Sequence, residues 1–226
     1  DDDDVDEVLA TFSFDQGLIN RGTIYASGVN IGFDATALSI SGSEDGTGTV
    51  TIDGGILNSG TIQGTAYEAS AVGLLLGNGT AIGTLENSGS IAATTYTLTD
   101  DTAKALFISN GSTLEAILNS GSITASSNGY GGAATAITAE SDTLRYITNT
   151  GAISGLLISD GREDSETGSS IAIDLSAQTA GATIIQYQET PTEEVNGDDE
   201  SDEDDVTEPT SKGDGRCGTG DDRLQI

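Results

Sequence analysis

One polar phrase recurs along the chain within a regular alternation of apolar and polar positions. The phrase is Asn-x-Gly-x-Ile, and its five copies span residues 20–24, 58–62, 87–91, 119–123 and 149–153. The asparagines are 38, 29, 32 and 30 residues apart, and a large apolar residue stands two positions before each one. An apolar spacing of two, in segments rich in Gly, Ser and Thr, predicts β-strands rather than helices.

The alternation predicts two inward columns of large apolar side chains. One column collects the last residue of each phrase, namely Ile24, Ile62, Ile91, Ile123 and Ile153. The other collects the residues that precede each Asn, namely Leu18, Ile56, Leu85, Ile117 and Ile147. A second phrase recurs at residues 35–40, 69–74, 103–108, 134–139 and 170–175. It consists of a small residue followed by x-Ala-apolar-x-apolar, or a close variant. Ile184 and Ile185 stand where a sixth strand before an Asn would fall.

The Asn and Gly of each phrase predict a structural corner. A chain that winds as a coil has to bend between its faces, and Gly or Asn tolerates the positive φ that such bends often need. An inward Asn that returns once per coil can also bond its amide to the Asn above and below, which satisfies its polar groups on burial. The predicted corner residues are Asn20 and Gly22, Asn58 and Gly60, Asn87 and Gly89, Asn119 and Gly121, and Asn149 and Gly151.

A repeat of about 30 residues with two or three short strands predicts one turn of a parallel β-solenoid. Five to six such coils, stacked at the usual inter-strand distance of about 4.8 Å, form an all-β body. A β-sandwich is the alternative, since short strands separated by frequent turns suit it too. The sandwich does not explain why the same residue types return at the same place in every repeat.

Charge divides the chain into a body and acidic appendages. The formal net charge is −30, yet 17 of the 37 acidic residues lie in residues 1–7 and 189–208. We therefore expect an acidic N-terminal segment over 1–8, a solenoid over 9–188, an acidic flexible insertion over 189–212, and over 213–226 a Gly/Asp turn and terminal strand that could begin a further coil. The charge disfavours nucleic-acid binding, and no apolar stretch approaches the length of a membrane helix, so we expect no direct membrane insertion.

The phrases resemble a known class of surface protein. The Asn-Ser-Gly-x-Ile phrases, the Ala-x-Ala-apolar strands, and the segment from 170–175 into 183–186 are similar to passenger regions of autotransporter-type surface proteins of Gram-negative bacteria. The resemblance covers about residues 17–187 and 218–226. It implies a right-handed parallel β-helix and export to the cell surface or the extracellular space, and it does not specify a host or surface ligand.

Motifs outside the repeat have plain structural interpretations. Gly218, Gly220 and Asp222 fit half of a calcium-binding β-roll repeat, but only one copy is present, so an acidic turn before a terminal strand is preferred and calcium is the alternative. Cys217 is interpreted as an incidental thiol, with a bridge between two subunits as the alternative. Asn78 and Asn110 begin glycosylation-like triplets, and the Asn-Gly pairs there predict turns.

The absence of His and the single Cys exclude His-based catalytic triads and His/Cys metal clusters, and no cofactor is expected. We expect a non-enzymatic structural or adhesive surface protein. The alternative is a self-assembling filament or surface-layer subunit that associates through the solenoid ends and the C-terminal strand at 224–226. A polysaccharide-acting enzyme is less favoured, because its candidate carboxylates are the adjacent pair Asp100 and Asp101 after a Thr-rich loop, and the bases do not obviously converge; these bases are Arg21, Lys104, Arg145 and Arg162.

Overall fold

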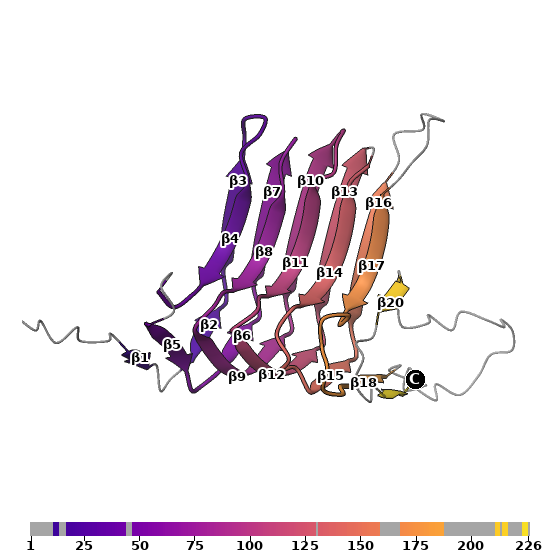
Figure 1. Ribbon diagram of the computed structural model, residues 1–226. Helices are drawn as coiled ribbons and strands as arrows, with labels where there is room; N and C mark the ends of the chain where they lie inside the picture. The colour runs from indigo at the N-terminus through magenta and orange to yellow at the C-terminus, as the bar shows by residue number, and fades with distance from the viewer. Residues whose placement is uncertain are drawn as a thin grey trace, which may run out of the picture.

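The computed structural model describes residues 11–13, 17–43, 47–129, 131–158 and 168–187, together with short strand segments at 211–212, 214–216 and 223–225. The chain winds as a β-solenoid with three parallel sheets, and each coil contributes to all three sheets (Figure 1). About four turns, averaging about 32 residues each, separate Asn20 from Asn149. All pairings between the strands are parallel, which confirms the predicted solenoid and excludes the sandwich.

Sheet A has nine strands and forms the base of the solenoid. In the earlier coils this side is built from two short strands, and β9 is long enough to pair with both strands of the coil before it. The strands of sheet A are β1 (Thr11–Ser13), β2 (Leu18–Asn20), β5 (Thr49–Ile52), β6 (Ile56–Asn58), β9 (Thr80–Asn87), β12 (Thr113–Asn119), β15 (Tyr146–Asn149), β18 (Thr183–Gln186) and β21 (Arg223–Gln225).

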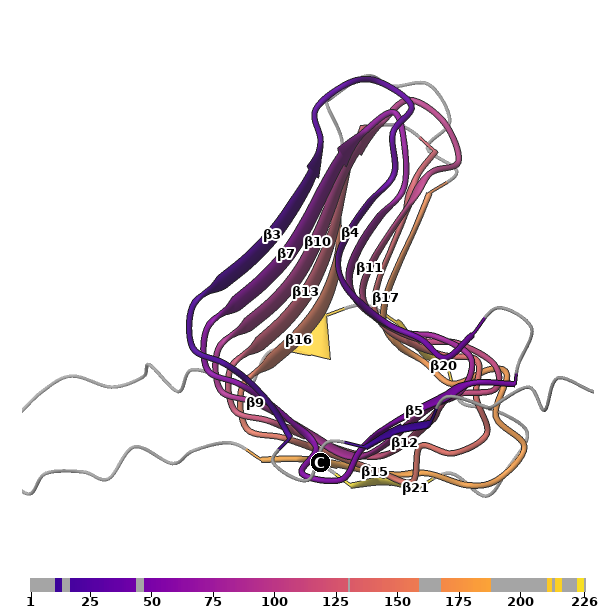
Figure 2. The same ribbon diagram turned by 90° about the vertical axis from the view of Figure 1, so that its left-hand side faces the viewer.

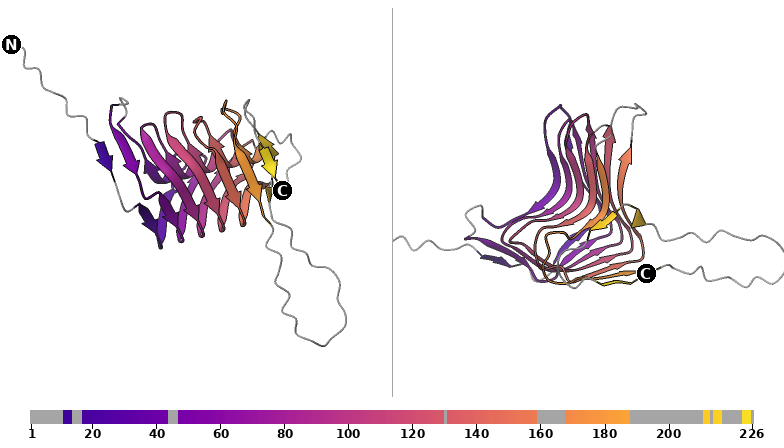
Figure 3. Two further views of the ribbon diagram at one scale, coloured as in Figure 1. Left: turned by 90° about the horizontal axis from the view of Figure 1, so that it is seen from below. Right: turned by 45° about the vertical axis from the view of Figure 1, so that its right-hand side comes forward.

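Sheets B and C have six strands each and rise side by side from the base (Figure 2). Sheet B contains β3 (Thr23–Gly28), β7 (Thr61–Tyr67), β10 (Ser90–Thr97), β13 (Ser122–Gly129), β16 (Ala152–Ile158) and β19 (Ser211–Lys212). Sheet C contains β4 (Ala35–Ile40), β8 (Ala71–Leu76), β11 (Thr102–Ile108), β14 (Ala133–Ala139), β17 (Ser169–Asp174) and β20 (Asp214–Arg216). Strands of successive coils follow in order along the solenoid (Figure 3).

The two predicted apolar columns are confirmed by the strand registers. Ile62 pairs with Ile24 on one side and Ile91 on the other, and the same column continues to Ile153. Ile56 likewise pairs with Leu18 and Leu85 in the column that precedes the asparagines. These side chains are buried from the second described coil onward, so the columns form the core where sheet A meets sheets B and C.

Small residues let sheets B and C approach each other closely. On sheet B the inward column after the Ile column is Ala26, Gly64, Ala93, Ala125 and Gly155. A Cβ added at Gly64 would lie 2.3 Å from the carbonyl oxygen of Val72 on sheet C, and one at Gly155 would lie 2.4 Å from that of Ile171. Such contacts leave no room for a Cβ at these two positions, and the other members of the column are Ala, so this part of the solenoid contains no large residue.

The predicted register of the second phrase is wrong in one coil. Ala35 pairs with Ala71 and Ala71 pairs with Ala103, so the copy in this coil is residues 71–76 rather than 69–74. Gly73 and Leu74 are both buried although they are adjacent, so strict alternation fails in the middle of β8. The same break occurs in β11, where the predicted register is right, so the error comes from Ala69 and Ala71, which match the Ala-x-Ala phrase two residues early.

Candidate functional site

The five corner asparagines form a continuous hydrogen-bonded ladder inside the solenoid. Each Nδ2 donates to the Oδ1 of the Asn in the following coil. The donor–acceptor distances are 2.7 Å for Asn20 to Asn58, 2.7 Å for Asn58 to Asn87, 2.7 Å for Asn87 to Asn119, and 2.6 Å for Asn119 to Asn149. All five residues are buried, which fits the inward, amide-to-amide arrangement expected from the sequence.

Backbone carbonyls provide further acceptors for each amide of the ladder. The Nδ2 of Asn87 lies 3.1 Å from the carbonyl oxygen of Ser122 in the next coil and 3.3 Å from that of Gly89 in its own corner. The same pair of contacts recurs at Asn58 and Asn119. An amide carries two N–H groups, so both donors are satisfied without water, and burial of these polar side chains carries no unpaired-donor penalty.

The ladder has a sixth rung that the sequence argument missed. Asn149 donates from its Nδ2 to the Oε1 of Gln186 at 2.8 Å. Gln186 follows Ile184 by two positions, as each Asn follows its apolar residue, and Ile147 pairs with Ile184 in the register. Ile184 therefore marks this position in the sequence, although Gln186 is a longer side chain with the same amide group. The Gln186 Nε2 is itself buried without a partner among the described residues.

The corner glycines are required for a different reason from the one predicted. None of the five adopts a positive φ, and the positive-φ glycines lie elsewhere, for example Gly79 and Gly111. Instead, a Cβ at Gly60, Gly89 or Gly121 would lie 2.0–2.1 Å from the carbonyl oxygen of the preceding corner glycine. The coils stack so closely at this corner that only Gly fits, and the expectation of a left-handed backbone there is wrong.

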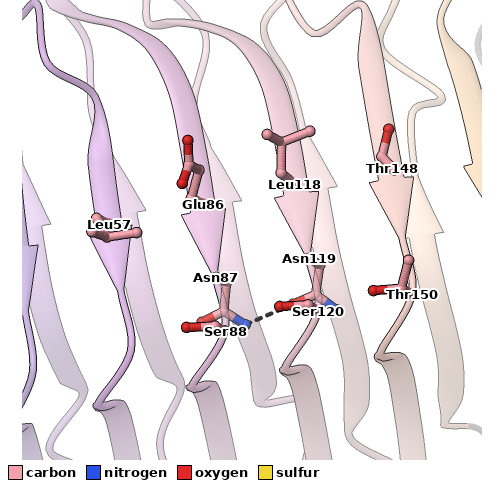
Figure 4. Close-up of a pocket in the computed structure, with 9 residues that line it drawn as sticks. All are labelled: Leu57, Glu86, Asn87, Ser88, Leu118, Asn119, Ser120, Thr148 and Thr150. Carbon is pink, nitrogen blue, oxygen red and sulfur yellow. Dashed lines mark hydrogen bonds between the residues drawn. The ribbon is translucent and has the colours of Figure 1, made fainter.

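A shallow groove of about 350 Å³ crosses the outer surface of sheet A beside the ladder. Its lining contains two rows of outward side chains, drawn in Figure 4. The first row is Leu57, Glu86, Leu118 and Thr148, and the second is Ser88, Ser120 and Thr150. Asn87 and Asn119 close the floor behind the second row, so the ladder supports this surface from within.

The charged residues considered for catalysis lie in separate places. Arg21 lies at the corner between β2 and β3, Lys104 lies on β11, and Arg145 directly precedes β15, whereas Arg162 falls outside the described residues. Lys104 lies 3.9 Å from the centre of the Phe107 ring and 4.0 Å from a Glu140 carboxylate oxygen. The structure brings no two of the three described bases together on one element.

The adjacent carboxylates Asp100 and Asp101 lie in the turn between β10 and β11. The Asp101 carboxylate accepts the hydroxyl groups of Thr97 at 2.7 Å and Thr99 at 2.9 Å. Those contacts tie the carboxylate to the turn. They account for the Thr-rich sequence of the turn as local hydrogen bonding.

A second corner, between sheets C and A, is organised by the exposed Asp142. Its carboxylate accepts hydrogen bonds from the Thr179 hydroxyl and from the backbone N–H groups of Thr179 and Ala180 in the next coil. The Thr179 hydroxyl, followed by the two N–H groups, holds the pKa of Asp142 below its ordinary value, with a further contribution from Arg145. This carboxylate therefore links two coils at a point where the sequence offered no repeat.

Several predicted sites lie outside the described residues or form plain turns. Gly218, Gly220, Asp222 and Cys217 all fall outside them. Within the part of the chain that the structure describes, no group of three His, Cys, Asp or Glu side chains could hold a metal ion. The same part contains no helix long and apolar enough to cross a membrane. Asn78 and Asn110 are exposed in turns, as the Asn-Gly pairs predicted.

The fold and the ladder define the class of this protein as a β-solenoid. Comparisons of the chain with protein-family models, with curated proteins and with solved structures find no match.

Proposed function

We propose that this chain is a non-enzymatic extracellular structural or adhesive protein. Its right-handed β-helix of five to six coils forms a stalk at the bacterial cell surface, or one secreted from it. The observation that carries this proposal is the unbroken amide ladder from Asn20 to Gln186, which ties each coil between these two residues to the next. A stack fixed from within leaves its outer side chains free to vary, which suits a spacer or a display scaffold.

The acidic surface supports the same function. A formal net charge of −30 keeps the chain soluble, repels other anionic surfaces, and disfavours partners such as nucleic acid. The resemblance of the repeat phrases to autotransporter-type passenger regions supports display outside a Gram-negative cell. A stalk of this kind needs no cofactor, and neither calcium nor insertion of this chain into the membrane is part of the proposal.

The arrangement of charges disfavours an enzyme. Hydrolysis of a polysaccharide requires two carboxylates that converge across the scissile bond. The adjacent pair Asp100 and Asp101 lies in a turn, where Asp101 is held by two threonine hydroxyls. We expect no product from a panel of polysaccharides, and turnover that is abolished by Asp101→Asn would overturn the non-enzymatic assignment.

Surface display is tested by proteolysis of intact cells of the source bacterium. We expect added protease to remove the protein from intact cells while a cytoplasmic marker stays whole, and antibody to label the cells without permeabilisation. Protection of the protein until the cells are lysed would refute the surface assignment.

A second candidate function, self-assembly through the solenoid ends, is favoured by the first coil. A Cβ at Gly22 would meet no atom within 4 Å, whereas the equivalent position at Gly60 meets a carbonyl oxygen at 2.0 Å. Asn20 likewise receives no amide from a preceding Asn among the described residues. The first corner thus has the Asn and Gly that stacked corners have, although no described coil packs on its outer face.

Self-assembly would place a further coil, supplied by a second copy, on this face. Electron microscopy at increasing protein concentration would show filaments that Gly22→Val prevents. Wild-type particles that stay single at all concentrations would refute self-assembly and leave the stalk proposal intact.

A further inference from the structure

An apolar row on the outer face of sheet A contains a single carboxylate. The strand registers place Ile19 beside Leu57, Leu57 beside Glu86, and Glu86 beside Leu118. Leu118 is 41% exposed, Ile19 is 52% exposed, and Glu86 is also exposed. In a chain this acidic, large apolar side chains on an open β-sheet face have no evident structural purpose, and such patches mark interaction surfaces.

The carboxylate of Glu86 is uncompensated in the described part of the chain. No described side chain forms an ion pair or hydrogen bond with it, and the described ion pair, Lys104 with Glu140, involves sheet C and the loop after it. Arg21 lies outside the groove lining, at the corner position that corresponds to Ser88 two coils earlier, about 10 Å away along the stack. That separation exceeds a Debye length of about 8 Å at physiological salt, so Arg21 does little to neutralise Glu86.

We propose that this groove binds a lysine or arginine side chain that stands between apolar residues of a partner polypeptide. The proposal rests on the adhesive function given above and deepens it by naming the adhesive surface and the chemistry of its partner. The cationic head pairs with Glu86, and the apolar neighbours pack on Leu57 and Leu118 on either side.

The chemistry of the groove matches the two parts of such a side chain. Lysine and arginine carry an aliphatic stem that packs on apolar surface and a charged head that stays hydrated. Leu57 and Leu118 flank Glu86 at one coil spacing each, so a stem that lies along the row to reach Glu86 packs on a leucine. The hydroxyl groups of Ser88 and Ser120 in the second row provide acceptors for the remaining N–H groups of the head.

The net charge of the chain selects for the same partner. A formal charge of −30 attracts cationic segments over long range and raises their rate of encounter, whereas it repels acidic peptides, phosphates and anionic lipids. The leucines then discriminate among cationic partners, because a cation without apolar neighbours leaves both side chains exposed.

The test uses a pentapeptide probe and the whole folded chain. Acetyl-Ser-Leu-Lys-Leu-Ser-amide is titrated into the isotope-labelled protein while the backbone amide chemical shifts are followed by NMR. We expect saturable shifts at Leu57, Glu86, Ser88, Leu118 and Ser120, and none when glutamate replaces lysine in the peptide. The absence of shifts at these residues at millimolar peptide would overturn the proposal.

Two matched variants separate this site from general attraction by an acidic surface. Glu86→Gln is expected to raise the Kd by about two- to fivefold, as for loss of an exposed ion pair. Glu115→Gln is the control, because Glu115 is exposed on the same strand as Leu118 but lies outside the groove. If both substitutions change the Kd equally, the peptide binds by nonspecific charge attraction and the proposed site is refuted. The assay is independent of cell location, so this inference and surface display can fail separately.

Discussion

Removal of a central rung of the amide ladder should cost more stability than removal of its end. Asn87→Ala deletes two hydrogen bonds between asparagines, both at 2.7 Å, one accepted from Asn58 and one donated to Asn119. Each contributes about 1 kcal/mol net, and the orphaned buried Oδ1 of Asn119 adds a penalty of about 1–3 kcal/mol. The expected loss in the free energy of unfolding is therefore about 3–5 kcal/mol.

Asn20→Ala deletes only one bond between asparagines, and it orphans the Oδ1 of Asn58, which is buried. We expect a loss of about 2–4 kcal/mol there. Asn128→Ala is the control, because its side-chain contacts of 3.4–3.5 Å are weak, and it should change stability by less than about 0.5 kcal/mol. Urea unfolding followed by circular dichroism measures all three. A cost for Asn87→Ala no larger than that for Asn128→Ala would refute the structural role of the ladder.

Three further predictions concern the corners and calcium. Gly89→Ala places a Cβ about 2.1 Å from the carbonyl oxygen of Gly60 and should destabilise by about 3 kcal/mol or more, whereas Gly22→Ala should be nearly neutral; equal melting temperatures would contradict this. The pKa of Asp142 is lowered in the folded state, so its stabilising contribution is present above the unfolded-state pKa and is lost as pH falls through the folded-state pKa. NMR titration of the Asp142 carboxyl group should find a midpoint below 3.8. A midpoint at or above 3.8 would contradict the hydrogen bonds from Thr179 and Ala180. Calcium should produce no binding heat in calorimetry on the whole chain, and chelation should leave the melting temperature unchanged; saturable heat at millimolar calcium, lost in Asp222→Asn, would instead support the β-roll interpretation.

The sequence was sufficient to predict the core because the inward positions repeat both in place and in chemistry. The Ile columns and the Asn ladder each need the same residue at the same point of successive coils, and parallel stacking brings these identical residues together. Any solenoid with one phrase per coil had to place Asn87 between Asn58 and Asn119. The solenoid and the ladder were therefore accessible from spacing alone.

Other features depend on distances that no period reveals. The glycine requirement at Gly89 arises from the approach of one coil to the next, and local backbone preference alone suggested a positive φ instead. Gln186 fills the ladder position with a longer side chain, so the Asn phrase does not predict it, although its amide accepts the same kind of hydrogen bond.

The groove was invisible in the sequence because outward positions vary from coil to coil. Leu57, Glu86 and Leu118 share one row only through the register between coils, and their sequence separations are unequal. Asp142 was missed for the same reason, since its partners Thr179 and Ala180 lie in a loop without a repeat. A regular spacing within the sequence predicts the core, whereas the arrangement of outward side chains can be described only once the strand registers are known.

The most direct test of the stacked coils is detection of the ladder itself in solution. Scalar couplings across hydrogen bonds, measured by NMR on deuterated protein, should connect the side-chain Nδ2 of each Asn to the Cγ of the next. The predicted connections run from Asn20 to Asn58, from Asn58 to Asn87, from Asn87 to Asn119, and from Asn119 to Asn149. Side-chain amides that show no such connections and exchange freely with water would contradict the stalk held together by this ladder.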